Sequence, residues 1–244
     1  MNINSTTLSR IKISETDLFK EATDVHCHFL PGVDDGIHDV TMSQAVLNYY
    51  KELGYTRIFL TPHIKEEFPE NNADSMRKAF NRYKEELAPE GVELKLAAEY
   101  LLDNTFFEYL ASGDLLTYND NHLLVETDFL IPIPDFQQQI EQVRSAGYIP
   151  VLAHPERYEY MDFEQYNWLK KNGCLFQINM LSLQGYYGDS IRERGLFLLE
   201  NDFCDFVGTD AHRYRNVRNG IENFYLTKDM IKKLEPLFEA NKTL

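Results

Sequence analysis

Short apolar runs alternate with segments of helical periodicity along almost the whole chain. Between the runs, apolar residues recur three and four positions apart, which is the spacing of one helix face; the clearest cases are Met42–Leu53 and Met76–Leu87. Repeated strand–helix units favour a parallel sheet, and seven of them in 244 residues predict a closed or nearly closed α/β barrel. The seven apolar runs are residues 24–29, 57–61, 93–98, 122–125, 149–153, 175–179 and 205–208.

The chain divides into a short N-terminal extension and one barrel domain. Residues 1–21 precede the first apolar run, and we expect them to cover the floor of the barrel or to mediate assembly. Residues 22–244 contain no Ser/Gly-rich linker and no low-complexity tract, which predicts a single domain. The first helix is expected to begin with a capping box formed by Thr41 and Gln44.

Charge and composition exclude several classes of function. The chain has 39 acidic and 24 basic residues and a net charge of −15, which argues against a nucleic-acid partner. The first twenty residues are polar, and no apolar run reaches the ~18 residues of a membrane span, so we expect no membrane insertion and a cytoplasmic protein. Three cysteines do not make a disulfide framework. The oligomeric state cannot be predicted.

Side chains that bind metals stand at the C-terminal ends of six of the seven runs; only the run 175–179 ends in a neutral amide. In a parallel α/β barrel these strand ends share one face, which is where active sites lie. The sequence therefore predicts that distant histidines and carboxylates converge at one mouth. The residues are His26, His28, His63, Glu99, Glu126, His154, Asp210 and His212.

This set of residues favours a site with more than one metal ion. His26 and His28 alternate along a strand and so point to the same side. Imidazole together with carboxylate suits Mn, Zn or Fe. A tetrahedral zinc takes four ligands, so eight or nine candidates imply two or three ions, and such sites favour hydrolysis of phosphate esters. His38 and His122 lie outside the strand-end pattern and are expected to be ordinary residues.

The motifs in their order resemble the polymerase-and-histidinol-phosphatase (PHP) superfamily, over roughly residues 22 to 240. The opening segment and the segment His154-Pro155-Glu156-Arg157-Tyr158 are most similar to the bacterial manganese-dependent protein-tyrosine phosphatases of the CpsB/YwqE type. The resemblance implies a distorted parallel (β/α)7 barrel of the PHP type in a single domain. The matching motifs are Asp24-Val25-His26-Cys27-His28, Asp34-Asp35-Gly36, Thr61-Pro62-His63, Glu99, Glu126, His154–Tyr158 and Asp210-Ala211-His212.

The resemblance also assigns a metal-ligand set and a phosphate-binding arginine. Glu99 matches a carboxylate that bridges ions, and Asp35 rather than Asp34 matches the ligand beside the glycine. Arg157 matches the phosphate-binding arginine, as a guanidinium fork beside metals would. The implied ligands are His26, His28, Asp35, His63, Glu99, Glu126, His154, Asp210 and His212.

A second phosphate-binding arginine is expected about five residues after the last metal histidine. In this chain that spacing falls on Val217, between Arg215 and Arg218. We favour Arg218, with a short loop insertion. Together with Arg213, these arginines form a local positive patch on an acidic protein.

The function implied by the resemblance is hydrolysis of phosphotyrosine in proteins by a metal-activated hydroxide, with Mn²⁺ as the cofactor and Fe or Zn as substitutes. Asp210 or His154 would donate a proton to the leaving group. The implied partner is a phosphotyrosine-containing protein, a bacterial tyrosine autokinase of capsule or exopolysaccharide synthesis.

Three alternatives stay open at this point. One is a PHP-type phosphatase of a small ester such as histidinol phosphate, one is a PHP nuclease, and one is a barrel that binds phosphotyrosine without catalysis. Cysteine-based phosphatase chemistry is excluded, because it needs an arginine six residues after the cysteine. The residues six positions after Cys27, Cys174 and Cys204 are Val33, Met180 and Asp210.

Overall fold

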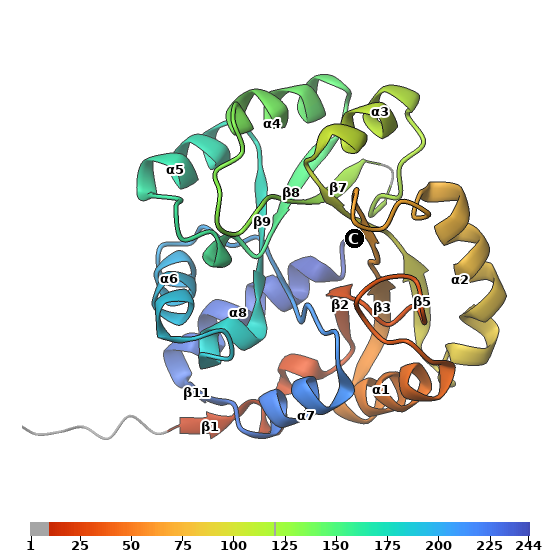
Figure 1. Cartoon of the computed structure of the whole chain (residues 1–244). Coiled ribbons are helices and arrows are strands. Elements are labelled where there is room, and N and C mark those ends of the chain that lie inside the picture. Colours follow the sequence, from red (N-terminus) through yellow and green to blue (C-terminus); the bar gives the residue numbers. More distant parts are fainter. Residues whose placement is uncertain (1–9, 120) are drawn as a thin grey trace, which may run out of the picture.

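Parallel strands surround a common axis in the computed structural model, which describes residues 10–119 and 121–244. A three-stranded sheet has the order β2-β3-β5, and a six-stranded sheet has the order β10-β9-β8-β7-β6-β4. Together they form a distorted (β/α)7 barrel in a single domain (Figure 1). The strands are β2 (Ala22–Cys27), β3 (Tyr55–Leu60), β4 (His63–Ile64), β5 (Glu93–Leu96), β6 (Glu99–Leu101), β7 (His122–Glu126), β8 (Ile149–Ala153), β9 (Leu175–Asn179) and β10 (Phe206–Gly208).

Two strands of the barrel are broken in the middle, and this is the source of its distortion. The chain passes from β3 to β4 through Thr61 and Pro62, and from β5 to β6 through Ala97 and Ala98. The first halves pair in the three-stranded sheet, whereas the second halves pair in the six-stranded sheet. The second halves bring His63 and Glu99 into register as neighbours. The break therefore turns both residues toward the same mouth.

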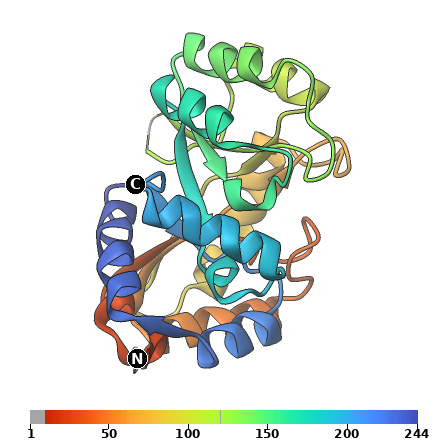
Figure 2. The same ribbon diagram turned by 90° about the vertical axis from the view of Figure 1, so that its left-hand side faces the viewer.

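The described residues form eight helices, and most of them surround the strands (Figure 1). In the side view, α8 lies at one end of the barrel, and the loops after the strands lie at the other (Figure 2). No helix in the described part of the chain has the length and apolar character needed to cross a bilayer. The helices are α1 (Val40–Leu53), α2 (Ala73–Leu87), α3 (Asn104–Ser112), α4 (Phe136–Ser145), α5 (Phe163–Lys171), α6 (Asp189–Glu200), α7 (Tyr214–Glu222) and α8 (Lys228–Asn241).

The predicted capping box at the first helix is wrong. Helix α1 begins at Val40, so Thr41 already lies inside its first turn. The N-cap is Asp39, whose carboxylate accepts a hydrogen bond from the backbone N–H of Met42 at 2.9 Å. Either Asp or Thr can cap a helix, and the sequence pattern alone did not separate the two.

The described part of the N-terminal extension packs against the C-terminal part of the chain. Strand β1 (Arg10–Lys12) pairs antiparallel with β11 (Tyr225–Thr227). Ile13 is fully buried, and its backbone N–H donates to the carbonyl of Phe224 at 2.8 Å. Residues 10–19 therefore share the hydrophobic core of the barrel domain.

The barrel closes between β2 and the end of β10 through a short backbone bridge and through side chains. The backbone N–H of Asp210 donates to the carbonyl of His26 at 2.8 Å, and that of His28 to the carbonyl of Ala211 at 3.0 Å. The buried Asp24 carboxylate accepts hydrogen bonds from Thr209 Oγ1 at 2.6 Å and from Thr209 N at 3.2 Å. Asn241 of α8 donates to the carbonyls of Thr23 and Val207. These contacts hold the first and last barrel strands together directly below His26 and Asp210.

We predict that Asp24→Ala lowers the free energy of unfolding by about 2–4 kcal/mol, because it leaves buried donors of Thr209 and His26 without an acceptor. Asp24→Asn keeps an acceptor oxygen, so it should lower the free energy of unfolding by less than half as much as Asp24→Ala does. Urea unfolding of metal-free protein measures both changes. Asp229→Ala, at an exposed carboxylate of α8, is the control and should change the value by less than about 0.5 kcal/mol. An equal, small effect at Asp24 and Asp229 would contradict this account of the seam.

Candidate metal centre and phosphate pocket

The nine ligands expected from the sequence all converge at one mouth of the barrel. Their donor atoms form three overlapping groups, and within each group the atoms lie within 4.8 Å of one another. His63 and Glu99 each belong to two groups. The groups are His28, Asp35, His63 and His212; His26, Glu99, His154 and Asp210; and His63, Glu99 and Glu126.

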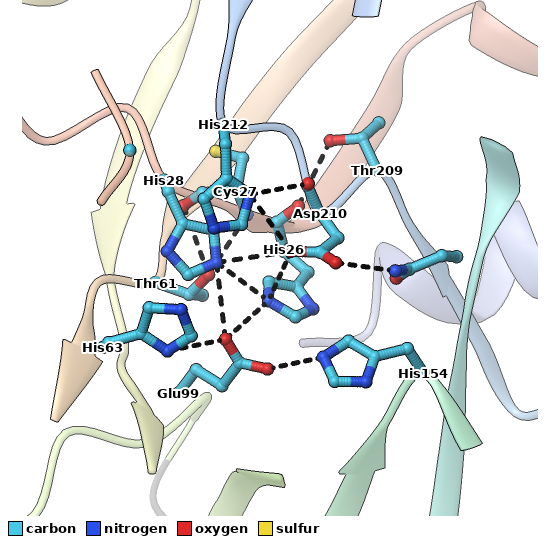
Figure 3. Close-up of polar contacts among 12 residues, drawn as sticks. His26, Cys27, His28, Thr61, His63, Glu99, His154, Thr209, Asp210 and His212 are labelled. Carbon is cyan, nitrogen blue, oxygen red and sulfur yellow. Dashed lines mark hydrogen bonds and ion pairs between the residues drawn. The ribbon is translucent and has the colours of Figure 1, made fainter. Parts of the chain in front are cut away.

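The Glu99 carboxylate lies between His63 and His154, with His26 above it in Figure 3, and it is fully buried. Its Oε2 atom is 3.1 Å from His26 Nε2 and 3.1 Å from His63 Nδ1, while Oε1 is 2.9 Å from His154 Nε2. Burial disfavours the charged form, but the adjacent imidazoles of His26 and His63 outweigh it and hold the pKa of Glu99 well below its usual range. The carboxylate thus stays charged in a site without water contact.

Several donor atoms in this cluster are left without hydrogen bonds by the described residues. Glu99 Oε2 and His63 Nδ1 are buried and lie 3.1 Å apart, but they do not meet in hydrogen-bond geometry. The Nε2 atoms of His26 and His28 face each other at 3.2 Å. Buried polar atoms are normally satisfied, and lone pairs facing one another need a proton or a cation between them. The residues therefore fit a set of divalent metal ions.

Two of the candidate ligands have a strained backbone. His154 has φ 34° and Asp210 has φ 50°, both in the left-handed region that residues with a Cβ rarely adopt. His154 directly follows β8, and Asp210 lies two residues after the end of β10. Such strain persists where the surroundings fix it, and it commonly marks functional sites.

The adjacent residues Asp34 and Asp35 have different roles. Asp35 is half exposed, and its Oδ1 lies 3.5 Å from His63 Nε2 and 3.4 Å from His212 Nε2. Asp34 is buried, and its Oδ2 accepts a hydrogen bond from His28 Nδ1 at 2.9 Å. Although burial opposes it, this bond lowers the pKa of Asp34 to about 2. Asp34 therefore orients His28, so that its Nε2 faces the centre.

The strand that the sequence analysis set aside, β9, supplies two further groups. Gln177 Oε1 accepts a hydrogen bond from His26 Nδ1 at 2.6 Å, which turns Nε2 of the ring toward the other candidate ligands. Asn179 Nδ2 donates to Asp210 Oδ2 at 2.7 Å. Gly208 makes room for Gln177, because a Cβ there would lie 2.8 Å from Gln177 Nε2. Their two-residue spacing on one strand face was the sequence signal for this pair.

Arg157 lies beside the cluster in a fixed orientation. Its Nη1 donates to Asp210 Oδ2 at 2.9 Å. The guanidinium carbon lies 4.0 Å from the ring centroid of Phe129 and 4.6 Å from that of Tyr187, so the fork is held between two aromatic rings. Neither aromatic residue was predicted, because nothing in the sequence pattern distinguishes them from core residues.

A pocket of about 300 Å³ opens over the same cluster. Arg213 lines it and donates to backbone carbonyls of Asp35, Gly36 and His212, which ties together two loops that carry candidate ligands. The structure does not bring Arg218 to this pocket: its Nε donates to Glu222 Oε1 at 2.8 Å on the exposed side of α7. The lining residues are Asp35, Arg157, Leu181, Tyr186, Tyr187, Asp210, Ala211, His212, Arg213, Asn216 and Val217.

The cysteines are unsuited to nucleophilic chemistry. Cys27, Cys174 and Cys204 are free, and burial raises the pKa of each thiol. A reactive thiolate needs the opposite environment. The chemistry of the mouth therefore rests on imidazoles, carboxylates and Arg157.

Comparison with known proteins gives a consistent set of relatives. Tyrosine-protein phosphatase YwqE of Bacillus subtilis is 30% identical over 230 residues, which cover 91% of this chain and 90% of YwqE. Tyrosine-protein phosphatase CpsB of Streptococcus agalactiae serotype V is 26% identical over 199 residues, covering 78% and 82% of the two chains. A chain from the crystal structures of B. subtilis YwqE and Streptococcus pneumoniae CpsB, described as unique metal-dependent tyrosine phosphatases, matches with a TM-score of 0.67 and 26% identity, covering 89% of this chain and 94% of that one.

The family model described as "Capsular polysaccharide synthesis, CpsB/CapC" matches residues 22–234. That range takes in every candidate ligand, from His26 to His212, and Arg157. The chain belongs to the CpsB/CapC family.

Proposed function

We propose that this protein is a metal-dependent protein-tyrosine phosphatase that hydrolyses phosphotyrosine. The observation that carries the proposal is the cluster of three overlapping groups of metal donors beside an open pocket. Arg157 lines this pocket together with the candidate ligands Asp35, Asp210 and His212. Such a site joins metal ions with a guanidinium fork, which together suit a phosphoryl group. Membership of a family whose named relatives are tyrosine phosphatases supports the same reaction.

We assign three metal ions to the three groups, with Mn²⁺ as the physiological metal and Fe or Zn as substitutes. Nitrogen and carboxylate donors suit these ions, and no thiolate faces the mouth in the described part of the chain. When bound, the ions would supply a hydroxide nucleophile at neutral pH and neutralise charge on the phosphoryl oxygens. Glu99, which belongs to two groups and has two carboxylate oxygens, would help to hold two of the ions, whereas His63 would hold an ion through one ring nitrogen.

Arg157 would bind the non-bridging oxygens of the phosphoryl group. Its Nη1 is engaged by Asp210, and the two flanking rings hold the rest of the fork toward the pocket. We assign the second contact to Arg213 rather than Arg218, because Arg213 lines the pocket. Tyrosine leaves as a phenolate with a pKa near 10, so it can leave without a proton from Asp210 or His154, which would both be occupied as metal ligands.

We propose a phosphotyrosine-containing protein as the substrate, and specifically a bacterial tyrosine autokinase of capsule or exopolysaccharide synthesis in the cytoplasm. The description of the family as one of capsular polysaccharide synthesis supports this pathway. The pocket is open and lies at the surface mouth of the barrel, as a protein-borne phosphate requires.

Replacing Arg157 should remove most of the activity. With p-nitrophenyl phosphate and Mn²⁺-loaded protein, we expect Arg157→Ala to lower kcat/KM by about a hundred- to a thousandfold, because the developing charge loses its oriented donor. Arg157→Lys should keep more of the wild-type kcat/KM than Arg157→Ala but not all of it, since an ammonium lacks the planar fork. The control is Arg218→Ala, which removes an exposed ion pair and should stay within about twofold of wild type. Equal losses at positions 157 and 218 would count against the assigned roles.

Metal binding should stabilise the fold through Glu99. At a Mn²⁺ concentration a hundred times its Kd, each site adds about 2.7 kcal/mol to the free energy of unfolding. We expect Mn²⁺ to raise the Tm of metal-stripped wild type and to lose most of that effect in Glu99→Gln, because the neutral amide would lack the charge that two groups share. Differential scanning calorimetry measures the shift, and Glu108→Gln on the exposed part of α3 serves as the control. A Glu99→Gln variant that responds to Mn²⁺ like wild type would refute the role of Glu99.

A further inference from the structure

A second hollow continues from the pocket of the metal centre along helix α7. It also has a volume of about 300 Å³ and shares Tyr186 and Asn216 with the first pocket. A third hollow shares Gln184 and Asn223 with the second and extends it. Because each hollow shares two lining residues with the next, we describe them as one groove that begins at the pocket over the candidate ligands. The second hollow is lined by Gln184, Gly185, Tyr186, Asn216, Asn219, Gly220 and Asn223.

Side-chain amides wall the second hollow, whereas the third hollow also has Arg10, Asp189 and Arg192 in its lining. Asn216, Asn219 and Asn223 are three and four positions apart, so they follow one face of α7 and its end. Gln184 ends the facing 3₁₀ helix Met180–Gln184. None of the residues that line the second hollow carries a charge at neutral pH. An acidic protein thus presents a neutral, hydrogen-bonding surface beside its metal centre.

Several of these amides have unused hydrogen-bonding capacity. The side chains of Asn216 and Asn219 are exposed, and neither forms a hydrogen bond with another of the described residues. Gln184 Oε1 is buried and has no hydrogen-bond partner there. A buried acceptor without a partner is costly unless a ligand or water satisfies it. The α7 wall of the groove therefore has free donors and acceptors, and the facing wall holds the buried, unpaired oxygen of Gln184.

The walls are held rigidly at this separation. Gly220 of α7 lies so close to Leu181 that a Cβ at position 220 would come within 2.7 Å of Leu181 Cδ2. Val217 and Ile221 are buried on the same side of the helix, which leaves the asparagines facing out. The groove is thus a formed feature of the packing between α7 and the 3₁₀ helix.

We propose that this groove binds the main chain of the peptide that carries the phosphotyrosine. A side-chain amide offers both a donor and an acceptor, which match the C=O and N–H groups of a peptide unit. Hydrogen bonds to the peptide main chain do not depend on the side chains of the peptide, so the groove would bind different sequences beside the phosphotyrosine. The inference rests on the proposed function and adds to it a preference for phosphorylated polypeptide over small phosphate esters.

The test compares two substrates of the Mn²⁺-loaded protein, a phosphotyrosyl peptide of about eight residues and p-nitrophenyl phosphate. Asn219 is the position to change, because it lines the second hollow and not the pocket over the metal centre. We expect Asn219→Ala to raise KM for the peptide by about three- to tenfold, the loss of one or two hydrogen bonds. Asn219→Trp should fill the groove and raise KM for the peptide more than tenfold. Turnover of p-nitrophenyl phosphate should stay within twofold in both variants.

Asn48, an exposed asparagine in the middle of α1 that lines none of these hollows, provides matched controls as Asn48→Ala and Asn48→Trp. Both should leave KM for the peptide unchanged. Asn219 variants that keep the wild-type KM for the peptide, or that lose activity equally on both substrates, would contradict the proposed peptide groove. Neither result would contradict the proposed function. Wild-type protein that hydrolyses neither substrate with Mn²⁺ would instead refute the proposed function.

Discussion

The buried carboxylate of Glu99 is the interaction on which the rest of the site depends. A carboxylate with no water contact is costly to bury unless positive charge surrounds it. Imidazoles of His26, His63 and His154 lie within 3.1 Å of its oxygens and come from three different strand regions. The position of one carboxylate thus fixes how β2, β4 and β8 meet at the mouth.

The fold supplies this meeting point by breaking its second and third barrel strands and by closing the barrel with a short backbone bridge that buried side chains reinforce. The breaks before His63 and Glu99 move those residues from one sheet to the other. The seam contacts of Asp24 with Thr209 hold β2 and β10 below the ligands. A second layer of Asp34 and Gln177 then fixes which imidazole nitrogen faces inward. Supporting residues of this kind decide how well a metal site is pre-organised.

Much of this could be predicted from the sequence because the pattern is periodic and the ligands are chemically distinctive. All seven apolar runs coincide with barrel strands, and the nine expected ligands lie together. The short second halves β4 and β6 were not predicted, since two or three residues carry no recognisable period.

The supporting residues of the site were harder to predict. Phe129 and Tyr187 look like core aromatics until the fold places Arg157 between them. Arg218 was favoured by spacing alone, but the turn of α7 directs it toward Glu222. Side chains that act through distant contacts leave no local pattern.

The number and position of bound metal ions test the central claim most directly. Crystals of Mn²⁺-loaded protein, measured at the manganese absorption edge, would show each ion as an anomalous-scattering peak. This account predicts three peaks, one within each group of donors, with Glu99 touching two of them. A single peak, or peaks away from these residues, would contradict it.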